Sequence, residues 1–256
     1  MFKKTLWLSA VIALGLGMAD ARPLSEIEAS GVLKVGVPGD YAPLAFYQDE
    51  ALVGFDVDVA NAVASHWNLT LEFVNTSWPT LSEDLEADKF DIAMGGISFT
   101  NDRNERFQLT KPIIPDGKVA MAQCEKATSL KTLDTINQKS TIVAVNPGGT
   151  NERFVNAHFD QATIVRTPDN VKNIQMIRDK EADMMITDMI EGNYYQHHEP
   201  ESFCVTNDKP FAGTENHQIY MTQQGNEALI HKLNEWLVDD HLNLIAEKWG
   251  IQLHID

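Results

Sequence analysis

The sequence predicts an α/β protein with two lobes and a ligand cleft between them. Short β-branched runs alternate with amphipathic helical segments, which is the pattern of parallel βαβ units. The alternation starts near residue 33 and starts again near residue 141, which indicates two similar modules. Ligands of such sheets bind beyond the carboxyl ends of the strands. The cleft is therefore expected where the two modules face each other.

The first module is expected in the N-terminal half of the chain, after residue 22. Apolar Phe55, Val59 and Val63 recur at helical spacing, and Pro79 suits the first turn of a second helix. The expected strands cover residues 33–37, 69–74 and 91–94, and the expected helices cover 55–67 and 78–85.

The second module repeats this order of strands and helices. Its expected strands cover 141–145, 162–165 and 182–186, and its expected helices cover 150–157, 171–178 and 188–195. A final segment, 226–249, reads as helical throughout without a strand partner and is expected to pack on one lobe. The predicted division assigns residues 22–118 and 216–256 to lobe 1 and 119–215 to lobe 2.

The charge balance excludes several classes of partner. The 256 residues include 20 Lys and Arg against 37 Asp and Glu, a formal net charge of -17, and 43% are hydrophobic. An acidic surface repels phosphate backbones and anionic lipid, which argues against nucleic acid and membrane surfaces. The composition therefore favours a globular protein that handles a small molecule.

The first residues are typical of an export signal. Lys3 and Lys4 precede an apolar run at 6–18, and Ala19-Asp20-Ala21 provides an A-x-A cleavage site. The run is shorter than the roughly 20 residues that span a bilayer, so a membrane anchor is not expected. Residues 1–21 are predicted to be a signal peptide, removed near Ala21.

Export bears on the two cysteines, Cys124 and Cys204. An oxidising compartment favours a disulfide between them. Two buried free thiols are the other interpretation that the sequence allows.

Neither a metal nor another cofactor is expected. The one histidine cluster, His197-His198, makes a poor chelate because adjacent helical side chains point about 100° apart. The sequence has no H-E-x-x-H, no phosphate-binding loop of the G-x-x-x-x-G-K-[ST] type and no G-x-S-x-G.

Two segments are candidate carboxylate seats, one in each module. In residues 95–103, glycines let the backbone approach a ligand, Ser98 and Thr100 offer hydroxyls, and Arg103 offers a planar fork. Arg103 could also be an ordinary surface charge. In 146–151, a strand turns into a helix whose free N–H groups can bind an anion. The alternative there is a tight turn with a capping residue.

Two acids begin the last helix of the second module. Asp188 and Glu191 lie at i,i+3 spacing and so share one helical face. Acidic residues are also favoured in any first helical turn, and the spacing alone favours that simpler interpretation.

The pattern G-x-S-x-T-x-x-R, ending at Arg103, resembles the periplasmic amino-acid-binding proteins of ABC transporters, solute-binding family 3. That resemblance implies a two-lobed periplasmic-binding-protein-like fold with hinge strands, and a periplasmic location. It also implies that Arg103 holds a ligand carboxylate and that Asp188 holds an amino group.

Further segments resemble the cyclohexadienyl dehydratases, enzymes built on the same scaffold. These segments lie at 39–41, 76–79, 90–94, 116–118, 146–152 and 187–191, within a match that runs from about residue 30 to 204. The resemblance implies dehydration and decarboxylation of arogenate to phenylalanine or of prephenate to phenylpyruvate, a carbon–oxygen lyase reaction. The sequence does not rank the two substrates.

The same resemblance assigns roles to the candidate residues. Glu191 would be the general acid, which requires a raised pKa, and closure of the cleft would supply it by desolvation. Lys118, beside the ring of the substrate, is predicted to be catalytic together with Glu191. The other residues implied around the ring are Asn146, Asn151, Tyr41 and Trp78, and those that would hold the amino-acid or keto-acid end are Ser98, Arg103, Thr150 and Asp188. Thr100 is the residue that amino-acid binders carry, so a non-catalytic receptor delivering to an ABC permease is the alternative.

Overall fold

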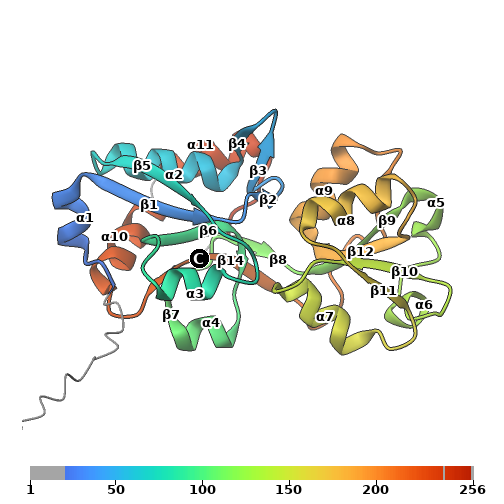
Figure 1. The fold of residues 1–256 in the computed structure, drawn as a ribbon. Helices are drawn as coiled ribbons and strands as arrows, with labels where there is room; N and C mark the ends of the chain where they lie inside the picture. The colour runs from blue at the N-terminus through green and yellow to red at the C-terminus, as the bar shows by residue number, and fades with distance from the viewer. Residues whose placement is uncertain (1–20, 239, 255–256) are drawn as a thin grey trace, which may run out of the picture.

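The computed structural model describes residues 21–238 and 240–254, which form two lobes side by side (Figure 1). Apart from Ala21, the predicted signal peptide lies outside the described residues. Within the described part of the chain, no helix combines the length and the apolar character needed to cross a bilayer.

The first lobe is built on a mixed sheet in the order β5-β1-β6-β14-β7, with β8 also paired to β14. Its parallel strands are β1 (Val32–Val37), β5 (Thr70–Asn75) and β6 (Ile92–Ser98). Its antiparallel strands are β7 (Phe107–Leu109), β8 (Ile114–Asp116) and β14 (Asn216–Gln223). A separate small sheet contains β2 (Asp40–Tyr41), β3 (Ala45–Gln48) and β4 (Ala51–Val53).

Apolar helix faces cover this sheet. Phe55, Val59 and Val63 are buried against strand residues such as Leu33 and Val35, as the helical spacing predicts. The helices of the lobe are α1 (Leu24–Ser30), α2 (Phe55–His66), α3 (Leu81–Glu86), α4 (Asn101–Arg106), α10 (Glu227–Leu237) and α11 (Asp240–Trp249).

The second lobe has a five-stranded sheet in the order β11-β10-β12-β9-β13. The strands are β9 (Lys118–Gln123), β10 (Ile142–Val145), β11 (Thr163–Arg166), β12 (Met184–Asp188) and β13 (Phe203–Val205). The helices are α5 (Cys124–Ala127), α6 (Leu133–Ile136), α7 (Thr150–His158), α8 (Asn170–Arg178) and α9 (Met189–His198). Val143, Val145 and Ile186 lie in its core.

The chain crosses between the lobes twice, once from β8 to β9 and once from β13 to β14 (Figure 1). The first crossing is fixed to the start of α9, because the N–H of Met189 donates to the carbonyl of Gly117 at 2.9 Å. The first sheet is left at Asp116 and the second entered at Lys118, and β13 of the second sheet ends at Val205 before β14 of the first begins at Asn216. These crossings are the hinge strands expected of the fold.

Three expectations about elements were wrong. Both sheets are mixed and not purely parallel, since β14 and β9 run antiparallel to β6 and β12. The second helix begins at Leu81 and not near Pro79, because the chain first forms a turn that accepts two N–H groups at the carbonyl of Ser77. The C-terminal segment is two helices, α10 and α11, rather than one.

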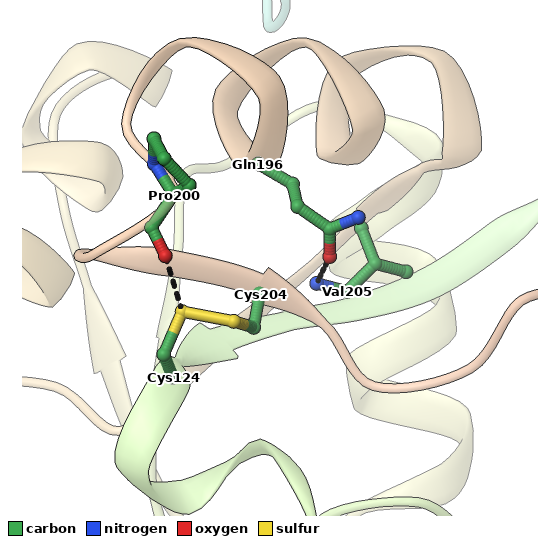
Figure 2. Close-up of a disulfide and its surroundings, with 5 residues drawn as sticks. All are labelled: Cys124, Gln196, Pro200, Cys204 and Val205. Atoms are coloured by element: carbon green, nitrogen blue, oxygen red, sulfur yellow. Dashed lines mark hydrogen bonds between the residues drawn. A yellow bond between two sulfur atoms is a disulfide. The ribbon is translucent and has the colours of Figure 1, made fainter.

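The cysteine pair is a disulfide, Cys124–Cys204, which confirms the favoured interpretation. It joins the first residue of α5, directly after β9, to β13 within the second lobe (Figure 2). Beside it, Gln196 of α9 accepts the N–H of Val205 at 2.8 Å, so the same edge strand is also tied to the helix that leads into the cleft (Figure 2).

Removing the disulfide is expected to lower the stability of the protein. The crosslink spans a sequence separation of 80 residues, for which loop-closure entropy predicts a loss of about 4 kcal/mol. Urea unfolding of the Cys124→Ser/Cys204→Ser variant should show that loss in the free energy of unfolding. The reduced native protein is the matched control, and a loss below about 1 kcal/mol in both would contradict the prediction.

Candidate functional site

A small cavity lies between the lobes, with about 350 Å³ of non-atom space that includes open solvent. Residues of both lobes line it, as the cleft prediction requires. They are Tyr41, Trp78, Gly96, Ser98, Arg103, Asn146, Gly149, Thr150, Asn151, Asn170 and Asp188. Among the sequence-predicted site residues, Thr100, Lys118 and Glu191 do not line it.

Arg103 forms a cationic wall of the cavity. Its side chain is buried, and Nη1 donates to the carbonyl of Ser98 at 2.5 Å. Burial, and next the nearby Arg153, lower the pKa of Arg103 to about 10, so it stays charged at neutral pH. Thr100 acts one step away, because its hydroxyl caps α4 by accepting the N–H of Arg103 at 3.1 Å. That cap orients the helix that carries Arg103.

The N-terminus of α7 faces the same cavity. Its N-cap residue, Gly149, has no side chain to cap the helix, and the first N–H groups of a helix lack intrahelical partners. Gly148 has φ 89°, and a Cβ there would lie 2.5 Å from the backbone N of Pro79. Glycine therefore lets this loop of the second lobe touch the first lobe, and the free N–H groups can meet an anion.

Lys118 and Asp188 form a buried ion pair behind the cavity. The Lys118 Nζ donates to Asp188 Oδ1 at 2.7 Å, to Thr150 Oγ1 at 2.7 Å and to Asn151 Oδ1 at 2.6 Å. Both side chains of the pair are over nine-tenths buried. One ammonium thus ties together β9, β12 and α7, and its three protons all have protein partners.

Two aromatic residues of the first lobe complete the wall. The hydroxyl of Tyr41 crosses the cleft and donates to Asp188 Oδ2 at 2.8 Å. The rings of Tyr41 and Trp78 meet edge to face, with centroids 5.8 Å apart. Gly96, at φ 91°, makes this possible, since a Cβ there would lie 2.5 Å from the Tyr41 ring. The pair gives the cavity an aromatic wall, against which a flat or nearly flat ring can pack.

Glu191 is fully buried, one helical turn beyond Asp188. Its Oε1 accepts from Asn170 Nδ2 at 2.6 Å, and its Oε2 forms a short hydrogen bond with the Thr187 hydroxyl. Burial raises the pKa of Glu191 well above its ordinary value, and the carboxylates of Asp40 and Asp188 add to the rise. Asp188, the N-cap residue of α9, makes no side-chain hydrogen bond to the helix, and Glu191 bonds to the side chains of Asn170 and Thr187. The two acids therefore do more than complement the helix dipole.

The structure adds residues that sequence reasoning did not select. Asn170 lines the cavity and Asp40 accepts its N–H, although Asp40 stood only within the segment 39–41 of the resemblance and Asn170 directly before the expected helix 171–178. Asn173 orients Asn146 by donating to its Oδ1 at 2.8 Å. Arg153, an exposed residue of the first α7 turns, adds positive charge near Arg103.

No cluster of three or more His, Cys, Asp or Glu side chains in the described ranges, 21–238 and 240–254, has the arrangement of a metal site. The pair His197-His198 is exposed near the end of α9. The polar groups at the cavity are instead suited to carboxylates and hydroxyls.

Comparison with known proteins finds similarity to bacterial extracellular solute-binding proteins and to cyclohexadienyl dehydratases. The family model of the bacterial extracellular solute-binding proteins, family 3, matches residues 33–252. A cyclohexadienyl dehydratase of Pseudomonas aeruginosa is 38% identical over 243 residues, covering 94% of this chain and 87% of that protein.

Two solved ancestral proteins are also similar. The amino acid-binding protein AncCDT-1, a precursor of cyclohexadienyl dehydratase, aligns with a TM-score of 0.80 and 28% identity over 88% of this chain and 98% of that one. A point variant of an ancestral cyclohexadienyl dehydratase, AncCDT-3, aligns with a TM-score of 0.53 and 38% identity over 91% and 98%.

Breaking the buried ion pair from one side should be costly. Lys118→Met leaves the Asp188 carboxylate buried without its cation, which is expected to destabilise the fold by about 3–5 kcal/mol. Adding Asp188→Asn removes the stranded charge and should restore at least half of that loss. Guanidinium unfolding of both single variants and the double variant measures the coupling, and strictly additive losses would contradict the pairing.

Proposed function

We infer that this chain, which belongs to family 3 of the bacterial extracellular solute-binding proteins, acts as a cyclohexadienyl dehydratase. The proposed reaction converts arogenate to phenylalanine, prephenate to phenylpyruvate, or both. The P. aeruginosa relative supports the activity, since it is 38% identical over nearly the whole chain. Family membership supports an exported protein, and cleavage near Ala21 with a periplasmic location is part of the proposal.

The observation that carries the proposal is the second buried acid, Glu191. A receptor that only holds an amino acid needs one carboxylate for the amino group, and Asp188 suffices. Glu191 instead lies in a dry site that favours its protonated form. A buried carboxyl with a raised pKa beside a ligand cavity is what a general acid requires near neutral pH.

The cavity suits a substrate with two carboxylates. One would meet Arg103, and the other would meet the free N–H groups at the start of α7. Asp188 is already neutralised by Lys118, so it adds little repulsion toward an anion. Tyr41 and Trp78 would form an aromatic wall beside the ring, with Asn146 and Asn151 at its edge. In this assignment Lys118 acts on the reaction by holding Asp188, Thr150 and Asn151 in place.

The chemistry then needs one proton. Glu191 would move past Asn170, which separates it from the cavity, and protonate the ring hydroxyl, which leaves as water. The bond to the ring carboxylate breaks, carbon dioxide departs, and that electron pair completes the aromatic ring. Aromatisation drives the step, so orientation and proton delivery are the protein's contribution, and a placed acid adds about 10²- to 10⁴-fold. No step calls for a cofactor.

A direct assay separates this proposal from a transport receptor. Purified protein is incubated with prephenate, and phenylpyruvate is followed by its absorbance in alkali, while calorimetry tests binding of standard amino acids. Turnover above the uncatalysed rate supports the enzyme. Absence of turnover combined with tight binding of an amino acid would identify a receptor that works with an ABC permease.

Glu191→Gln should lower kcat by about 10²-fold or more, because the amide cannot supply the proton. It keeps the shape of the side chain and its contacts with Asn170 and Thr187, so KM should change by less than about threefold. Glu199→Gln, at the far end of the same helix, is the matched control and should leave kcat unchanged. Near-normal kcat in Glu191→Gln would show that this carboxyl is not the acid.

A further inference from the structure

Asn170 stands between two carboxyl groups that belong to different lobes. Its backbone N–H donates to Asp40 Oδ2 at 3.0 Å, and its side-chain Nδ2 donates to the Asp40 carbonyl at 3.1 Å. The same Nδ2 also donates to Glu191 Oε1 at 2.6 Å. Asp40 lies on β2 of the first lobe, whereas Asn170 and Glu191 lie on α8 and α9 of the second. One amide group therefore connects the proposed acid to the opposite lobe.

Asp40 is held in place from its own side of the cleft. The indole Nε1 of Trp78 donates to its Oδ1 at 2.8 Å. The other oxygen sits at the N-terminus of α8, where a negative charge is favoured. The α8 N-cap residue, Asp169, uses its own carboxylate on the N–H of Lys172 at 2.8 Å, so the two acids do not compete for one donor. Burial, and to a smaller degree the carboxylate of Asp169, raise the pKa of Asp40, and the N–H donors of Asn170 and Trp78 at its two oxygens oppose that rise.

The charged groups around Glu191 explain what this contact does. Asp40 and Tyr41 face it from β2, Asp188 from the end of β12, and Tyr195 from α9 itself. The cation beside these groups, Lys118 on β9, is bound to Asp188.

Asp116, the last residue of β8, accepts the N–H of Ile190 at the start of α9. Burial, and next the carboxylate of Asp188, raise the pKa of Asp116. After burial, Asp40 is the largest influence that raises the pKa of Glu191. Asp40 and Asp116 both come from the first lobe, and Asp40 is the one that contacts Asn170 of the second lobe.

We propose that Asp40 is a positioning residue that makes protonation of Glu191 depend on closure of the lobes. This rests on the proposed function. When the lobes separate, Asp40 stays with the first lobe, and water replaces it around Asn170 and Glu191, so the carboxyl ionises. Closure removes the water and brings the negative charge of Asp40 back. While the lobes are closing and solvent still reaches it, Glu191 takes up one proton. That proton later leaves with the ring hydroxyl as water.

The first test is the pH dependence of kcat in Asp40→Asn. A general acid works when protonated, so kcat falls as pH rises through its pKa in the closed complex. Without the charge of Asp40, this alkaline limb should move down by about one pH unit, which makes kcat about tenfold lower on the alkaline side. On the acid side, kcat should come within a few-fold of the native protein.

Two control variants distinguish charge from fit. Asp169→Asn removes a negative charge from the same helix N-terminus. Because the Asp169 carboxylate raises the pKa of Asp40, its removal favours the ionised form of Asp40, and the alkaline limb should not move down. Asp40→Glu keeps the charge, so its limb should stay near the native position even if kcat drops. A uniform drop of kcat in Asp40→Asn at every pH, or no change in kcat at all, would overturn the proposal, because Asp40 would then only hold the two lobes together.

A second measurement does not depend on turnover. Titration of the native protein with phenylpyruvate, in two buffers of different ionisation enthalpy, counts the protons taken up on binding. Uptake of about one proton is expected on the alkaline side, none in Glu191→Gln, and a smaller value in Asp40→Asn. No uptake by the native protein would overturn the coupling. Uptake without prephenate turnover would retain the coupling and reject the dehydratase.

Discussion

The cleft depends on the hydrogen bonds and the ion pair that the ammonium group of Lys118 forms. Three acceptors from different parts of the second lobe surround it, and one of them is the buried carboxylate of Asp188. With its charge balanced, Asp188 can accept the hydroxyl of Tyr41 from the opposite lobe at 2.8 Å. Because the ammonium of Lys118 is paired with Asp188, it does not stabilise an ionised Glu191 one turn further along α9. The same ion pair therefore orders the cavity and leaves the second acid to take up a proton.

The overall charge of the chain does not describe this site. A formal net charge of -17 suits a soluble acidic surface and opposes the approach of anions. Inside the cleft, Arg103, the nearby Arg153 and the start of α7 make a local positive region. Arg103 remains charged because its pKa, although lowered by burial, is still about 10. An anionic ligand is thus attracted by groups that lie close to it, where screening by salt and water is weakest.

Sequence patterns predicted the parts of the site that are local in the chain. The turn at 146–151 and the pattern ending at Arg103 each place a ligand group directly after a strand, and both reach the cavity. Asp40 and Asn170 are 130 residues apart and meet only because the lobes touch, so no spacing rule could join them. Propensity likewise could not place the start of α3 at Leu81. A turn closed on the carbonyl of Ser77 comes first, and Trp78 in that turn donates to Asp40, which is distant in the sequence. Nor could it divide α10 from α11. Local chemistry was readable, whereas contacts made by lobe closure were not.

Closure of the lobes, as proposed for this chain, gives no chemistry by itself. The contacts between the lobes here involve groups that also surround the second acid. Tyr41 contacts both Asp188 and Thr187, and Asn170 contacts both Asp40 and Glu191. Closing the cleft therefore changes the electrostatic environment of Glu191 at the moment when a ligand is enclosed. In such an arrangement a receptor needs few new side chains to become a catalyst, because the closing motion already dehydrates the site and brings a negative charge beside the acid. A carboxyl placed where the lobes meet would acquire its raised pKa from a movement that the scaffold already performs.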